Sequence, residues 1–128
     1  MKPSIKSWLE LAATDLLAAQ RLQDDERLTN ISCFHSQQCV EKGLKALLES
    51  RNIMPPKMHD LIRLYGMLEA ELRIEEDMLA RLNEVYIDSR YPTAIGSLPH
   101  GAPSLEDTKA FYEFARAFNQ KVIAIIGD

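Results

Sequence analysis

The stretch that decides the fold class is residues 30–51, NISCFHSQQCVEKGLKALLESR. At about 100° per residue, its apolar side chains gather on one face of a helix. These core-face residues are Cys33, Val40, Leu44 and Leu47. Asn30 is the candidate N-cap of this helix. Pro55 and Pro56 follow shortly after, and because proline cannot continue a helical hydrogen-bond ladder, we expect the helix to end near residue 51.

Segments on both sides repeat the same apolar period, and no segment shows the alternation of a strand. They cover about residues 4–22, 59–72, 75–89 and 104–126. The last of them opens with Ser104-Leu105-Glu106-Asp107, which resembles a capping box. The sequence therefore predicts an all-α protein: an antiparallel up-and-down bundle of four main helices plus one short helix, in a single domain spanning residues 1–128.

Composition narrows the class of protein. The 128 residues are 46% hydrophobic and 27% charged, which is the balance of a soluble globular domain. The longest uncharged apolar run, Val122 to Ile126, is too short for a membrane span, so we expect no membrane association. If Cys33 and Cys39 lie on one helix, they point in different directions, which argues against a disulfide and favours a reduced, cytoplasmic protein.

The charge is acidic overall but unevenly spread. A net charge of −4 argues against a general nucleic-acid coat protein. Residues 42–63 nevertheless hold five basic side chains against two acidic ones, and residues 69–88 hold seven acidic against two basic. The basic region could attract a phosphate-bearing ligand, or it could be ordinary charge mixing on helix surfaces.

The side of helix 30–51 that lies opposite its core face is unusual. An arc of about 100° contains Phe34, Gln38, Glu41, Lys42 and Lys45. One interpretation is a solvated face with a Glu41–Lys45 surface ion pair, worth a few tenths of a kcal/mol. The other is a subunit interface or groove, which suits Phe34 and the amide of Gln38 better.

Asp15 lies at the edge of the apolar arc of the first helix. If its carboxylate is buried it needs a partner, and Lys42 or Lys45 could supply one. If it is not buried, it simply reaches water. In the first case Asp15, Gln38 and Glu41 would form one polar network with the two lysines.

The three histidines, His35, His59 and His100, lack the spacing of helical metal ligands, so we expect no metal and no cofactor. His59 precedes the third helix, where it could cap that helix or face a ligand. Tyr86, Arg90 and Tyr91 stand at the mouth of a long loop, residues 92–103. Arg90 there suits a phosphate or nucleobase contact, but it could equally bind carbonyls at the end of its own helix.

Taken in order, these residues resemble a known family. The matching stretches are Trp8, Ala12-x-x-Asp15-Leu16, Cys33-Phe34-His35-Ser36-Gln37-Gln38, Glu41-Lys42-x-Leu44-Lys45-Ala46-Leu47-Leu48, Pro56-x-x-His59-Asp60-Leu61 and Tyr86-x-x-x-Arg90-Tyr91-Pro92. The chain resembles a stand-alone prokaryotic HEPN domain (higher eukaryotes and prokaryotes nucleotide-binding). The resemblance implies a bundle similar to the C-terminal domain of kanamycin nucleotidyltransferase, a homodimer, and a minimal nucleotidyltransferase partner in a toxin–antitoxin-like pair.

Ribonuclease members of that family carry an Arg followed, after four to six residues, by a His. Here seven residues separate Arg27 from His35, seven separate Arg51 from His59, and nine separate Arg90 from His100. None of the three pairs fits, so the resemblance favours a non-catalytic module that binds a nucleotide or RNA. The alternatives are a metal-independent ribonuclease with a displaced Arg/His pair and a purely dimeric interaction protein. The expected ligand-binding residues are Lys42, Lys45, His59, Tyr86, Arg90 and Tyr91.

Overall fold

The structure is a computed structural model that describes residues 1–68, 72–90 and 102–127, with the side chains of residues 86–90 left out of the description. Its helices are α1 (Pro3–Leu22), the 3-10 helix η1 (Glu26–Leu28), α2 (Thr29–Ser50), α3 (Leu61–Gly66), α4 (Glu76–Arg90) and α6 (Leu105–Ile126). Across these described ranges five α-helices and no strand are present, which confirms the predicted all-α class. None of these helices is long and apolar enough to cross a membrane.

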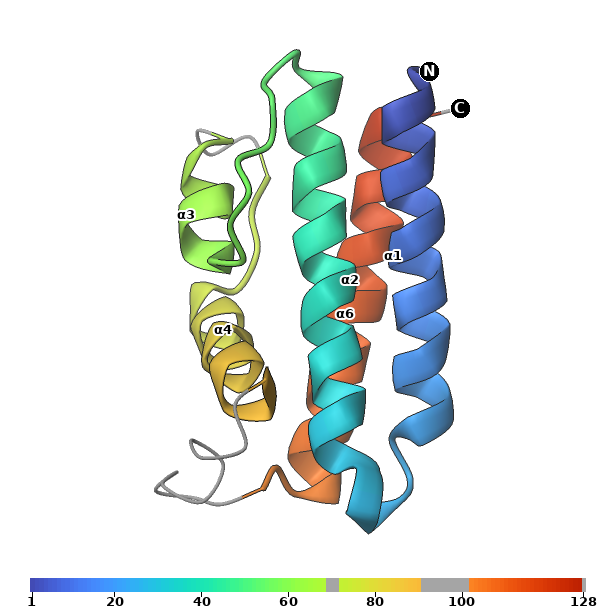
Figure 1. The fold of residues 1–128 in the computed structure, drawn as a ribbon, viewed down its shortest axis with the longest axis vertical. Helices are drawn as coiled ribbons and strands as arrows, with labels where there is room; N and C mark the ends of the chain where they lie inside the picture. Colours follow the sequence, from blue (N-terminus) through green and yellow to red (C-terminus); the bar gives the residue numbers. More distant parts are fainter. Residues whose placement is uncertain (69–71, 91–101, 128) are drawn as a thin grey trace.

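Helix α2 lies at the centre of the bundle. Figure 1 shows α1 on one side of α2, α3 and α4 on the other, and α6 behind, with successive long helices running in opposite directions. Because neighbours surround α2 on three sides, most of its residues are buried, including Val40, Leu44 and Leu47 at 0% exposure. Only a narrow side of α2 is left between α1 and the α3–α4 pair.

The close approach of α2 and α6 depends on Gly43. A Cβ atom added at Gly43 would lie 2.9 Å from Cε2 of Phe118 and 3.3 Å from Cγ2 of Val122. Both neighbours are themselves buried, at 2% and 0% exposure, so they have little room to move. The absence of a side chain at this position therefore sets the distance between the two helices.

The helix ends follow the sequence in part. Ser104 is the predicted N-cap of α6: its side chain accepts a hydrogen bond from the backbone N–H of Asp107 at 3.0 Å. The prediction that Asn30 caps α2 is wrong, because α2 already begins at Thr29, directly after η1. The N-cap position of α2 is Leu28, and no side chain caps the helix there. Asp25 instead caps the preceding η1, where its side chain accepts from the backbone N–H of Arg27.

The third helix is shorter than the predicted 59–72. Asp60 caps α3, since its Oδ1 accepts hydrogen bonds from the N–H groups of Ile62 and Arg63. The helix ends at Gly66, and a turn follows at residues 67–68. Residues 69–71 lie outside the described part. Of the two expectations for His59, the capping role is therefore wrong, because Asp60 holds that position.

Both cysteines are buried free thiols on α2. Burial raises the pKa of Cys33 to about 11, and burial together with the nearby Asp15 carboxylate raises the pKa of Cys39 to about 12. Both thiols therefore stay protonated at neutral pH and act as small core side chains. This agrees with the prediction that they form no disulfide.

Candidate functional site

The side of α2 between α1 and the α3–α4 pair carries a row of polar side chains, which we call the polar strip. It consists of His35, Gln38, Glu41, Lys42 and Lys45 on α2, together with the two side chains that contact them from either side, Asp15 of α1 and His59 of the loop before α3. The strip contains two clusters, each built on one carboxylate.

The first cluster joins α1 to α2 through Asp15. The Asp15 side chain comes from α1 and is buried, at 8% exposure. Its Oδ2 accepts a short hydrogen bond from Nζ of Lys42, and its Oδ1 lies 2.9 Å from Nδ1 of His35. Of the two expectations for Asp15, the buried and paired one is confirmed, and Lys42 is its lysine partner.

The second cluster is centred on Glu41. Its Oε2 lies 3.1 Å from Nζ of Lys45 and its Oε1 lies 2.9 Å from Nδ1 of His59. Glu41 and Lys45 are only 3% and 6% exposed, so the interpretation of this arc as a solvated face is wrong. The physical reason is coverage by other elements: the ring of Trp8 on α1 lies 5.5 Å from Nζ of Lys45, and the loop carrying His59 covers Glu41.

His59 is held in place by its backbone as well as by its ring. The fully buried amide of Gln37 donates a hydrogen bond to the carbonyl oxygen of His59 at 3.3 Å. On the other side of His59, Asn83 of α4 accepts from the N–H of Leu61 at 2.8 Å and donates to Oδ1 of Asp60 at 3.2 Å. The imidazole is half exposed, at 50%, although Glu41 and Gln37, which hold its ring and its backbone, are buried.

His35, Gln37 and Asn83 were not among the predicted site residues. A helical projection could have suggested His35, because it lies within about 20° of Lys42 on α2. Its role depends on Asp15, which comes from another helix. Gln37 lies near the core side of the helical projection. Because a buried amide needs hydrogen-bond partners, its position there could have indicated a buried polar contact.

The charges of the polar strip nearly cancel. The two carboxylates, Asp15 and Glu41, are matched by the two lysines, Lys42 and Lys45, at close range. With neutral histidines the strip therefore carries no net charge. The lysines, which sequence reasoning assigned to a ligand, are engaged with carboxylates, and Lys45 has little surface to offer.

The remaining predicted ligand residues are only partly described. Tyr86 and Arg90 lie on α4 as predicted, but their side chains are outside the description, and Tyr91, His100 and most of the 92–103 loop lie outside the described residues altogether. Figure 1 shows α4 beside the N-terminal half of α2.

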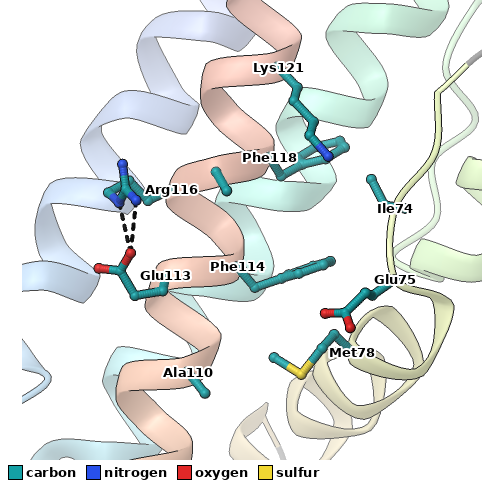
Figure 2. Close-up of a pocket in the computed structure, with 10 residues that line it drawn as sticks. Ile74, Glu75, Met78, Ala110, Glu113, Phe114, Arg116, Phe118 and Lys121 are labelled. Carbon is teal, nitrogen blue, oxygen red and sulfur yellow. Dashed lines mark hydrogen bonds and ion pairs between the residues drawn. The ribbon is translucent and has the colours of Figure 1, made fainter.

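A separate cavity of about 590 Å³ lies between the start of α4 and α6. Figure 2 shows Phe114 of α6 reaching toward Met78 and Glu75, while the Glu113–Arg116 ion pair lies on the side of α6 that faces away from them. Of the predicted ligand residues with described side chains, Lys42, Lys45 and His59, none lines this cavity. The candidate site is therefore the polar strip, where the predicted residues meet.

A family model of the HEPN domain matches residues 5–125. The chain belongs to the HEPN family. Two solved structures share its fold: TT1696 from Thermus thermophilus, at 25% identity and TM-score 0.76, covers 94% of this chain and 97% of its own. ST0689, described as an archaeal HEPN homologue, is 27% identical with TM-score 0.71 and covers 99% of this chain and 100% of its own. No curated protein matches the chain.

Proposed function

We propose that this HEPN protein is a non-catalytic module that binds a nucleotide in the cytoplasm, as a homodimer, and acts with a minimal nucleotidyltransferase partner. The observation that carries the proposal is the fixed position of His59. A half-exposed imidazole is held by the buried carboxylate of Glu41 and the buried amide of Gln37. Positioning of this kind is more than a helix end requires, and it is typical of a side chain that meets a ligand.

The contacts of His59 also support a role for α4. Asn83 ties the loop after His59 to α4, which is the helix that carries Tyr86 and Arg90. The loop, α2 and α4 are thus held together by hydrogen bonds. In this proposal Arg90 and His59 contact phosphate, and Tyr86 or Tyr91 stacks on the base.

The contacts of two arginines argue against two of the three Arg/His pairs of the ribonuclease alternative; the third pair, Arg90 and His100, lies outside the described side chains. Arg51, which would pair with His59, donates from Nη1 to the carbonyl oxygen of Leu68 at 2.7 Å. Arg27, which would pair with His35, forms a salt bridge to Asp25 at 2.9 Å. Each guanidinium thus has a partner other than the histidine that would complete a displaced pair. A purely dimeric interaction protein would need no Arg/His pair. The thermal melts with nucleotides described below distinguish it from the proposed module, because such a protein would show no nucleotide response.

The dimer in this proposal is formed through the N-terminal part of α2. Ile31 is 47% exposed and Phe34 is partly exposed, and both lie at the end of the polar strip. Apolar side chains beside a polar row are common in subunit interfaces. A two-fold arrangement would bring two polar strips together across the axis.

The test is a set of thermal melts with ATP, GTP, CTP and UTP, on wild type, Arg90→Ala and a control, Arg21→Ala. Arg21 is an exposed arginine in the last turn of α1. We expect one nucleotide to raise the melting temperature of wild type and Arg21→Ala by a few degrees, and to leave Arg90→Ala unchanged. A nucleotide response that Arg90→Ala leaves intact would contradict the site.

Two parallel measurements test the class of function. The same samples are incubated with RNA, and we expect no cleavage; cleavage that Arg90→Ala abolishes would instead establish the ribonuclease. The chain is also mixed with a minimal nucleotidyltransferase, and we expect the two to migrate as one complex in gel filtration. Separate migration would contradict the partner assignment.

A further inference from the structure

The two clusters of the polar strip repeat one pattern. In each, a carboxylate that is at most about a tenth exposed binds one lysine and one histidine. Asp15 binds Lys42 and His35 across two helices. Glu41 binds Lys45 and, from the loop before α3, His59. A lysine–carboxylate–histidine unit differs from a simple ion pair in one property: its net charge depends on whether the histidine is protonated.

The histidines are the outer members of both clusters. The side chains of Lys45 and Lys42 are 8% and 18% exposed, whereas those of His35 and His59 are 29% and 50% exposed. In both imidazoles Nδ1 faces the carboxylate, so Nε2 is the ring nitrogen on the opposite side. An anion that approaches the strip from solvent therefore meets the imidazoles before it meets the ammonium groups.

Building on the proposed nucleotide-binding function, we propose that a second phosphate group of the nucleotide, besides the one that Arg90 and His59 contact, binds to protonated His35, with Lys42 beside it, and that binding takes up a proton. Imidazole changes its charge between about pH 5 and pH 8, unlike any other side chain of the strip. A protonated His35 gives its cluster a net charge of +1 and turns Nε2 into a charge-assisted donor to phosphate oxygen. The lysines alone cannot do this, because each is already matched by a carboxylate.

The surroundings of His35 fit this role. Among the described side chains, the charged groups in contact with it or its partner are Asp15 from α1 and Lys42 from α2. The edge of the Phe34 ring packs against the imidazole, with the ring centroids 5.5 Å apart. Asp15 and Phe34 thus fix the orientation of the ring before the ligand arrives, which reduces the entropy lost on binding.

By linkage, a site that binds an anion better when protonated must take up protons when the anion binds. The affinity for the nucleotide should then fall as the pH rises through the range in which imidazole changes its charge. With one linked proton the fall approaches tenfold per pH unit at the upper end of that range. The proposal thus predicts a number of protons as well as a pH dependence.

The experiment is isothermal titration calorimetry of the whole chain with ATP, GTP, CTP and UTP at about pH 6 and about pH 8. Each titration is run in buffers that differ in ionisation enthalpy, so the protons taken up can be counted. The comparison variant is His35→Asn, because an asparagine amide near the place of Nδ1 still donates to Asp15 but does not titrate. A phosphate group with a second pKa of about 6 is almost fully ionised at about pH 8, so protons taken up at that pH bind to the protein.

We expect tighter binding to wild type at the lower pH. At about pH 8, where free imidazole is mostly unprotonated, we expect wild type to take up more protons than His35→Asn, with the difference approaching one. Loss of all binding in His35→Asn, with proton uptake by wild type, also supports the assignment. If a nucleotide binds both proteins with equal proton uptake, the role of His35 is wrong while the proposed function stands. If no nucleotide binds wild type at either pH, the proposed function fails, and this inference fails with it.

Discussion

Replacing Glu41 with glutamine removes one charge from a buried ion pair while keeping the size of the side chain. Lys45 would then stay charged at 6% exposure, with its carboxylate partner gone. Breaking a buried pair in this way costs about 3–5 kcal/mol of unfolding free energy. The ring of Trp8 still lies 5.5 Å from the ammonium group and partly compensates, so we expect the lower end of that range, about 3 kcal/mol.

The assay is urea unfolding of wild type and variant, followed by circular dichroism. For a chain of 128 residues, a loss of about 3 kcal/mol also lowers the melting temperature by roughly 10 °C. The matched control is Glu113→Gln on α6, which removes the same charge from an i,i+3 pair with Arg116 whose side chains are 58% and 41% exposed. Because exposed pairs contribute little, we expect this control to lose less than about 0.5 kcal/mol.

A double variant, Glu41→Gln with Lys45→Met, separates charge from packing. It removes the unpaired ammonium group, so it should recover a large part of the stability lost by Glu41→Gln alone. If Glu41→Gln and Glu113→Gln lose equal stability, the Glu41–Lys45 pair is not buried in solution. The account of the polar strip would then be wrong.

Three further outcomes are expected. A double-mutant cycle of Asp15→Asn and Lys42→Met should give a coupling above about 0.5 kcal/mol, because the two groups share a partly buried hydrogen bond; additive losses would contradict the contact. Gly43→Ala should lower the free energy of unfolding in urea by about 1–3 kcal/mol, because the added methyl group clashes with α6. Gly66→Ala is the control: an added Cβ there meets nothing within 4 Å, so we expect a neutral or slightly stabilising effect. Equal effects of the two substitutions would refute the close packing of α2 and α6. Phe34→Ala should shift a dimer toward monomer in sedimentation at micromolar concentration, and a wild-type chain that stays monomeric there would refute the proposed interface.

The long helices could be predicted from sequence because their signals are local. The 3.6-residue period places the core face of α2 correctly. The N-terminal end of α2 was misplaced because η1 directly precedes it, and a single 3-10 turn is too short to show a periodic signal. The later start of α3 also has a local cause. Asp60 and His59 are adjacent, and Asp is the stronger N-cap residue, so that choice could have been made from residue type alone.

The burial of the polar strip could not be predicted in this way. A helical projection places Glu41 and Lys45 opposite the core and therefore suggests solvent. The groups that cover them, Trp8 and the loop carrying His59, come from elements far away in the sequence. The same holds for Asp15 and His35, whose pairing requires the register of α1 on α2. Tertiary contacts decided these positions, and periodicity carries no information about them.

The central claim, that the polar strip is the ligand site, is tested most directly by mapping backbone amide chemical shifts in NMR during titration with the stabilising nucleotide. The account predicts that the largest shifts occur at His35, Gln38 and His59 and along the end of α4. Shifts concentrated instead on the residues around Met78 and Phe114, which line the cavity between α4 and α6, would contradict it.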